Sequence, residues 1–180
     1  MKEHYSASRQ FFVPLLLLVV LIFMLAGCGS DDKEDHIAVV KEYFQAVDKR
    51  NVSAIPVLFT EDATQEFVGN SGVIVGAEAI AKQLELALSQ LDSMKTDFIA
   101  FVEENNTVFA HVKHTAVFKA GGAFKNREGI TPPVVVFEES KTVAWQAMAI
   151  FKLDHGMIVD EKIVRDDVSI AIQMGPPVLN

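Results

Sequence analysis

The sequence predicts an α+β domain in which helices pack on one face of a curved antiparallel sheet. The first half holds three segments with apolar residues at helical spacing, and residues 96–165 hold the apolar and polar alternation of strands. Turn sequences divide the later strands at Asn105-Asn106 and at Asp154-His155-Gly156. Helices followed by a run of strands favour helices gathered on one side of the sheet. Three N-terminal helices around a curved sheet would leave a conical cavity, where a ligand site is expected.

Three helical segments account for the first half of the domain. Asp35 can cap the first helix, whose apolar residues fall on one face: Ile37, Val40, Phe44 and Val47. A shorter helical piece follows, with an inner side formed by Val52, Ile55 and Leu58. The third helix opens after Gly76, and its inward residues are Ala77, Ile80, Leu84, Leu88 and Leu91.

The remaining segments are predicted mainly as strands. Ala63–Val68 and Val73–Val75 form a hairpin, and the later strands are Thr96–Glu103, Thr107–Lys119, Thr142–Leu153 and Met157–Arg165. Residues 120–133 contain three Gly and two Pro, which is typical of a long exposed connection. Val134–Phe137 is either an extra strand or part of a lid. A last helical turn over Val168–Met174 stops at Gly175 and the prolines that follow.

Charge and cysteine content exclude several classes of protein. The 180 residues include 16 Lys and Arg against 24 Asp and Glu, a formal net charge of −8 with no basic cluster. Nucleic-acid binding is therefore not expected, because affinity for phosphates comes from clustered basic residues. The single cysteine allows neither an internal disulfide nor a multi-cysteine zinc site. No cofactor is indicated.

The N-terminus has the organisation of a secretory signal. Lys2 and Arg9 precede an apolar run from Phe11 to Leu25, and no charge falls between Arg9 and Asp31. The tetrad Leu25-Ala26-Gly27-Cys28 resembles the bacterial lipobox. That resemblance implies a signal peptide over residues 1–27, cleavage before Cys28, and attachment of a diacylglycerol and acyl chains such as palmitate to this cysteine. The alternative is a plain transmembrane anchor, but the apolar run is shorter than the roughly 20 residues that span a bilayer.

Cleavage would leave an acidic domain on a lipid anchor. Residues 28–34 then form a lipidated tether, and the remainder has 14 basic and 23 acidic residues, a net charge of −9. Two or three acyl chains suffice for stable anchoring. The expected location is the bacterial cell envelope. Gly29 is not the aspartate that the resemblance associates with inner-membrane retention, so in a Gram-negative host the expected site is the outer membrane, facing the periplasm.

Residues 35–175 resemble the nuclear-transport-factor-2-like superfamily, closest to its SnoaL-like and steroid-isomerase-like branches, and residues 176–180 form a tail. The stretches that carry the resemblance are Tyr43-Phe44-Gln45-Ala46, Leu58-Phe59-Thr60-Glu61-Asp62-Ala63, Gly76-Ala77-Glu78-Ala79-Ile80, Phe151–Ile158 and Arg165-Asp166-Asp167 followed by Ile172-Gln173-Met174-Gly175. Each is short, and their shared order points to the fold. They are weak guides to function, because this fold hosts many activities.

The steroid-isomerase branch implies a tyrosine, a carboxylate base and a protonated acid. Tyr43 matches the tyrosine, whereas the base position falls on Phe67 and the acid position on Ala149. Two of the three groups are absent, so steroid isomerisation is not expected. Phe67 and Tyr43 remain candidates for lining a ligand pocket.

The SnoaL-like branch implies an acid on the last strand, and Asp166 is the matching position. Strand alternation places Ile158 and Asp166 on one face, whereas the opposite register would turn Glu161, Arg165 and Asp167 inward. The alternative for Asp166 is that it caps the helix that follows. Asp166 and Tyr43 are the candidate catalytic residues, with Asp166 as acid/base and Tyr43 as oxyanion donor.

Other chemistry-bearing side chains remain open. His111 and His114 lie three apart in a strand and point to opposite faces, so they cannot form a two-histidine metal site, and no metal cluster is predicted. Either Trp145 with Ala147 or Gln146 with Met148 faces the cavity. Trp145 is included among the candidate ligand-binding residues with Tyr43, Phe67 and Asp166.

Three functions are compatible with the sequence. The leading hypothesis is an envelope-anchored domain that binds a small apolar ligand or a protein partner without chemistry. The alternative is a SnoaL-like cyclase or isomerase that uses Asp166. The third is an assembly module, since sheets of the superfamily often pair face to face as homodimers, and large apolar side chains on the open face would favour it.

Overall fold

The computed structural model describes residues 35–69, 72–125 and 134–174. The predicted signal peptide (1–27), Cys28, the tether (28–34), most of the predicted connection and the tail (176–180) lie outside the described residues. In the part of the chain that the structure describes, no helix is long and apolar enough to span a bilayer.

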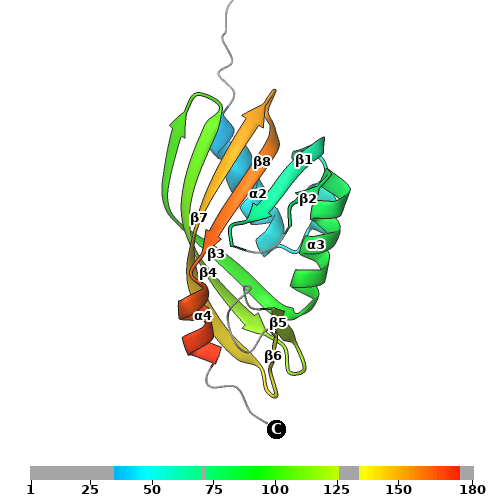
Figure 1. Cartoon of the computed structure of the whole chain (residues 1–180), viewed down its shortest axis with the longest axis vertical. Coiled ribbons are helices and arrows are strands. Elements are labelled where there is room, and N and C mark those ends of the chain that lie inside the picture. Colours follow the sequence, from blue (N-terminus) through cyan, green and yellow to red (C-terminus); the bar gives the residue numbers. More distant parts are fainter. Residues whose placement is uncertain (1–34, 70–71, 126–133, 175–180) are drawn as a thin grey trace, which may run out of the picture. The chain divides into compact units, whose positions relative to one another are not determined.

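A six-stranded sheet forms the centre of the domain, with its strands in the order β2-β1-β8-β7-β4-β3 (Figure 1). The strands are β1 (Phe59–Phe67), β2 (Ile74–Val75), β3 (Leu91–Glu104), β4 (Thr107–Phe118), β7 (Lys141–Asp154) and β8 (Met157–Arg165). The predicted hairpins are confirmed, because β1–β2, β3–β4 and β7–β8 each pair antiparallel.

The prediction of a wholly antiparallel sheet is wrong, because β1 pairs with β8 in parallel. Phe59 lies opposite Ile158 and Phe67 opposite Ile163, so the strands that come first and last in the sequence are neighbours in the sheet. Parallel neighbours need a long connection between them. Here that connection includes β2, α3 and three other strands of the sheet, and a pairing so distant in sequence leaves no local signal.

The described helices are α2 (His36–Asp48), α3 (Ala77–Ser89) and α4 (Asp167–Met174). The prediction of three N-terminal helices is therefore wrong: the middle piece is a single 3-10 turn, η1 (Val52–Ala54), and the third helix is C-terminal. Pro56 explains the short turn, because it has no N–H to donate to the carbonyl of Val52.

The inner face of the sheet packs against α2 and α3. The predicted cap is confirmed, since Asp35 Oδ1 accepts a hydrogen bond from Ala38 N at 2.9 Å. On α2, the Phe44 ring lies 5.7 Å from the Phe151 ring of β7 and meets it edge-on. Burying an aromatic side chain of this size stabilises the fold by about 2–3 kcal/mol. This contact fixes α2 over the centre of the sheet.

A separate two-stranded sheet, β5 (Ala123–Lys125) with β6 (Val134–Val136), extends from the end of β4. The alternative of an extra strand at 134–137 is thus confirmed. Phe137 holds this sheet in place, because its ring stacks on Phe118 of β4 at 4.6 Å. Gly122 is required there: a Cβ would meet the carbonyl oxygens of Lys119 at 2.8 Å and Gln90 at 2.9 Å.

Candidate functional site

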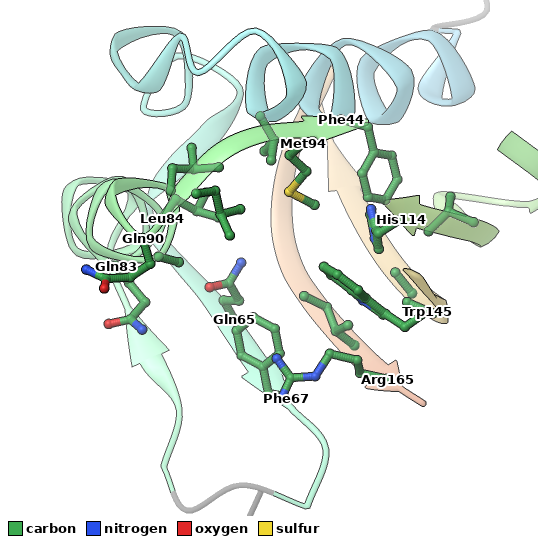
Figure 2. Close-up of a pocket in the computed structure, with 18 of the residues that line it drawn as sticks. Phe44, Gln65, Phe67, Gln83, Leu84, Gln90, Met94, His114, Trp145 and Arg165 are labelled. Atoms are coloured by element: carbon green, nitrogen blue, oxygen red, sulfur yellow. The ribbon is translucent and has the colours of Figure 1, made fainter. Parts of the chain in front are cut away.

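A pocket of about 400 Å³ lies between the two N-terminal helices and the inner face of the sheet (Figure 2). Its walls are largely apolar, and they include Phe44 and Val47 of α2, Leu84 and Leu88 of α3, Leu91 and Met94 of β3, Val112 and Phe118 of β4, and Trp145 and Ala147 of β7. Figure 2 shows Leu84 and Gln90 on one side of this space and Trp145 and His114 on the other. A pocket of this size and lining suits a small apolar molecule.

The pairing of β4 with β7 decides which side chains enter the pocket. Trp145 and Ala147 line it, whereas Gln146 and Met148 lie on the outer face. The prediction that the two histidines face opposite ways is confirmed: His114 lines the pocket. The ring of His111 instead bonds through Nε2 to Gln146 Oε1 at 2.7 Å on the outer face.

A β-bulge in β8 resolves the open register of the last strand. Leu153 lies opposite Ile158 and Lys152 opposite Asp160, so Val159 is an extra residue without a counterpart on β7. A bulge of this kind reverses the alternation beyond it. Ile158 is buried before the bulge, and the inward residues after it are Glu161, Ile163 and Arg165.

Asp166 lies outside the pocket as a result. Its side chain is exposed, and Oδ1 accepts a hydrogen bond from Ser169 N at 3.0 Å, which makes Asp166 the N-cap of α4. Its neighbour Asp167 is buried instead, and its Oδ1 accepts from Arg165 Nε at 2.6 Å. The acid/base role that the resemblance implied for Asp166 has no contact with the pocket to support it.

The first polar group in the pocket is the Glu161 cluster, formed by Tyr43, Gln65 and Glu161. Gln65 Nε2 donates to Glu161 Oε2 at 2.6 Å and contacts the Tyr43 hydroxyl at 3.4 Å. Gln65 and Glu161 are both fully buried. Glu161 Oε1 and Gln65 Oε1 have no hydrogen-bond partner among the described residues. The cluster therefore holds two buried acceptor oxygens that the described residues leave without a donor.

Burial controls the ionisation of the Glu161 cluster. It raises the pKa of Glu161 from 4.5 to about 7, and hydrogen bonds from Gln65 and Tyr43 oppose the shift. Burial, assisted by the nearby Glu161 charge, also raises the pKa of Tyr43 well above its ordinary value of 10. Glu161 can therefore accept or donate a proton near neutral pH, and Tyr43 remains a neutral hydroxyl.

The second polar group is the His114 chain, formed by Asp48, Thr96 and His114. Thr96 Oγ1 donates to Asp48 Oδ1 at 2.7 Å, the Thr96 N–H donates to Asp48 Oδ2 at 2.8 Å, and His114 Nδ1 lies 3.1 Å from Thr96 Oγ1. Burial, with a smaller effect of the Arg165 charge, lowers the pKa of His114 to about 4. The imidazole is therefore neutral at neutral pH.

The family of the chain follows from comparison with known proteins. A family model described as a SnoaL-like domain matches residues 40–161. The chain belongs to the SnoaL-like family. The matched residues include most of α2 and both polar groups of the pocket, and they end at Glu161 within β8, so the pocket residues Ile163 and Arg165 lie just beyond the match. No curated protein matches the chain.

Solved structures share the fold of this SnoaL-like domain at low sequence identity. A candidate SnoaL-like polyketide cyclase from Shewanella denitrificans OS-217 is 9% identical, with a TM-score of 0.65 over 77% of this chain and 96% of its own. One from Jannaschia sp. CCS1 is 14% identical, with a TM-score of 0.63 over 84% and 100%. An LEH-like epoxide hydrolase from M. tuberculosis is 13% identical, with a TM-score of 0.59 over 77% and 88%. At these identities the likeness concerns the fold.

The other predicted site residues of the SnoaL-like domain do line the pocket. Tyr43 belongs to the Glu161 cluster, and the Trp145 ring lies 5.3 Å from the His114 ring. Figure 2 shows Phe67 next to Arg165, and the guanidinium carbon of Arg165 lies 5.8 Å from the Phe67 ring centre. Among the described residues, no group of three or more His, Cys, Asp or Glu is placed to hold a metal ion.

From the sequence, Gln65 and Thr96 were not identified as site residues. Glu161 was considered only as a residue that the opposite register of the last strand would turn inward. One signal was present, because Gln65 lies midway between Ala63 and Phe67 on one face of β1. A polar residue within an inward-facing row must find a partner, and that partner is the acid on β8, the parallel neighbour of β1.

Proposed function

We propose that this SnoaL-like domain binds a small apolar molecule that carries a carbonyl group, and that Glu161 exchanges protons with the carbon next to that carbonyl. The observation that carries the proposal is the fully buried Glu161 carboxyl: its residue lines an apolar pocket of about 400 Å³, and its Oε1 has no hydrogen-bond partner among the described residues. A carboxyl group held near its pKa at neutral pH suits acid–base catalysis.

The proposed step has a simple balance of atoms and charge. The ionised Glu161 carboxylate removes a proton from the carbon, the electron pair of the broken C–H bond forms a carbon–carbon double bond, and the π pair of the carbonyl moves to its oxygen to give an enolate. The neutral Glu161 carboxyl then returns the proton to the same carbon or to another one, so that nothing is consumed. Arg165 lines the same pocket, and its positive charge favours the negatively charged enolate.

The competing function is binding without chemistry, in which the ligand is held and released unchanged. The apolar lining of the pocket supports it equally well. The two functions differ in the role of Glu161, because a binding protein needs its hydrogen bond but not its proton transfer. Replacing Glu161 by Gln keeps the size and a polar group, and it separates the two.

The test uses α-tetralone, an apolar bicyclic ketone, in deuterium oxide. Binding is followed by fluorescence of Trp145, which is the only tryptophan of the chain and lines the pocket. Deuterium uptake next to the carbonyl is followed by mass spectrometry. We expect wild-type protein to accelerate uptake, and Glu161→Gln to lower this rate on the order of a hundredfold while still binding.

Asp166→Asn is the matched control, because asparagine also caps helices and Asp166 lies outside the pocket. It should exchange at the wild-type rate. Equal rates in wild type and Glu161→Gln would contradict the catalytic role. If α-tetralone also binds to both proteins, that result favours the binding function.

We further propose that the domain is attached to a membrane of the bacterial cell envelope through lipidated Cys28. The order of the signal, the tetrad before Cys28 and the uncharged run between Arg9 and Asp31 support this. Mass spectrometry of the protein extracted from membranes should find a mature chain that begins at acylated Cys28. An unmodified Cys28 in membranes would refute the proposal, and Cys28→Ala should abolish the modification.

A homodimer is supported by the outer face of the sheet. Phe109 lies opposite both Val102 and Ile150, and Met148 lies opposite Val164, which gathers apolar side chains on this face beside His111 and Lys162. Met148 is 61% exposed and Val164 50%. Patches of this kind mark contact surfaces. Light scattering should give a dimer mass for wild type and a monomer mass for Met148→Lys; a monomeric wild type would contradict the proposal.

A further inference from the structure

We propose that Asp48 and Thr96 are positioning residues that fix the tautomer of His114, so that its Nε2 atom is a hydrogen-bond acceptor for a hydroxyl group of the ligand. This rests on the proposed function, because it concerns the ligand of the same pocket. It adds a second recognition point and narrows the ligand to an apolar carbonyl compound that also bears a hydroxyl.

The direction of the hydrogen bonds follows from Asp48. A carboxylate can only accept, and the Thr96 hydroxyl has one proton to give. Thr96 Oγ1 lies 2.7 Å from Asp48 Oδ1, so this proton is directed to Asp48. The Thr96 N–H donates to the other carboxylate oxygen at 2.8 Å, which holds the carboxylate in place at the end of α2.

The tautomer of His114 follows from Thr96. With its proton given to Asp48, Thr96 Oγ1 can only accept from His114 Nδ1, 3.1 Å away. Nδ1 therefore carries the proton of the neutral ring, and Nε2 keeps its lone pair. Because His114 lines the pocket, Nε2 is the ring nitrogen left for a ligand.

The surroundings of His114 keep this arrangement rigid and uncharged. The ring is 7% exposed and lies between Phe44, at 5.9 Å, and Trp145, at 5.3 Å. The charged groups that act on it are Asp48 of α2, through Thr96, and Arg165 of β8. A neutral acceptor in an apolar wall discriminates strongly, because a ligand without a donor leaves it unpaired.

The first test measures the tautomer itself, by NMR of the full chain labelled with nitrogen-15 in histidine, at neutral pH. The signal of His114 is assigned with the variant His114→Gln. We expect the proton on Nδ1 in wild type and in Thr96→Ser, which keeps the hydroxyl. In Thr96→Val the proton should move to Nε2, because Nδ1 loses its acceptor. A wild-type proton on Nε2, or an unchanged tautomer in Thr96→Val, would overturn the proposal.

The second test measures selectivity with para-tert-butylphenol and para-tert-butylanisole, which differ by one methyl group on the oxygen, followed by Trp145 fluorescence. Only the phenol donates a hydrogen bond. Wild type should bind the phenol about tenfold more tightly, the value of one good hydrogen bond. Thr96→Val should remove most of this preference, whereas Thr96→Ser should keep it. A preference unchanged in Thr96→Val would contradict the assignment of Nε2.

These outcomes separate this inference from the proposed function. The tautomer is measured without a ligand, so it can be confirmed or refuted even if Glu161 exchanges no protons. Conversely, normal deuterium exchange at α-tetralone with the wrong His114 tautomer would leave the role of Glu161 intact and remove that of Asp48 and Thr96.

Discussion

The two polar groups of the pocket differ in how completely they are satisfied. In the His114 chain, each hydrogen bond leads to the next, from the ring through Thr96 to Asp48. In the Glu161 cluster, two buried oxygens have no partner among the described residues. The chain fixes the orientation of the His114 ring and leaves only Nε2 of that ring for a ligand, whereas the cluster keeps buried acceptor oxygens that no described residue satisfies. This difference supports the proposal of positioning for the first group and of proton transfer for the second.

Burial also acts on the two groups in opposite directions. It raises the pKa of the Glu161 acid to about 7 and lowers the pKa of the His114 base to about 4. In both cases burial disfavours the charged form. The comparison thus predicts opposite dependences of stability on pH, and these can be separated by mutation.

The largest expected effect concerns Glu161 and pH. The folded state raises its pKa from 4.5 to about 7, so folding stability falls as the pH rises from about 4.5 to 7 and then stays level. The full change is about 3 kcal/mol. Relative to wild type, Glu161→Gln should therefore gain about 3 kcal/mol in free energy of unfolding across this window. Urea denaturation at a series of pH values measures it.

Glu104→Gln is the control for this experiment, since Glu104 is exposed at the end of β3. It makes the same exchange of a carboxyl for an amide outside the pocket. His114 makes wild-type stability rise between about pH 4 and 6.5, which is why the difference between the variant and wild type is the quantity to compare. A flat difference for Glu161→Gln would show that Glu161 is not held near neutrality.

The next effect concerns the completeness of the His114 chain. Asp48→Ala removes the acceptor of two hydrogen bonds from Thr96, and we expect a loss of about 2 kcal/mol in the free energy of unfolding. Asp97→Ala, next to Thr96 on β3, removes an exposed ion pair with Lys95 and should cost clearly less, because solvent screens exposed ion pairs. Equal losses in the two variants would mean that the chain contributes no more than a surface contact.

The smallest effect concerns Tyr43 within the Glu161 cluster. Its hydroxyl contacts Gln65 Nε2 at the long distance of 3.4 Å and lowers the pKa of Glu161 slightly. Tyr43→Phe should cost roughly 0.5–1 kcal/mol of stability and move the pKa of Glu161 further upward. NMR titration of Glu161 in the variant measures the shift. A downward shift would show that Tyr43 does not stabilise the carboxylate.

Local features of the fold were predictable from the sequence. The Asp35 cap, the buried face of α2 and the bounds of β8 were predicted, because capping, periodicity and turn residues act over a few positions. The parallel pairing of β1 with β8 was not, because it joins segments about 90 residues apart. No short-range pattern encodes such a contact.

Which residues of β8 enter the pocket depended on the bulge in this strand, which the sequence did not reveal. The extra residue Val159 reverses the alternation of β8, which turns Glu161 inward and Asp166 outward. A regular strand through Ile158 would have given the opposite result.

The Ile172-Gln173-Met174 motif of the family resemblance has a structural explanation. The Gln173 side chain bonds to both the N–H and the carbonyl of Ala144, in the part of β7 that β8 does not reach, and so satisfies an open strand edge there.

The most direct test of the central claim is a titration of the Glu161 carboxyl itself. Carbon NMR of the protein labelled at the glutamate carboxyl groups, with Glu161→Gln to assign the signal, gives its pKa without any ligand. We expect a midpoint near 7. A midpoint near the ordinary 4.5 would contradict the account, because burial in the pocket would then not hold the Glu161 carboxyl near its pKa at neutral pH.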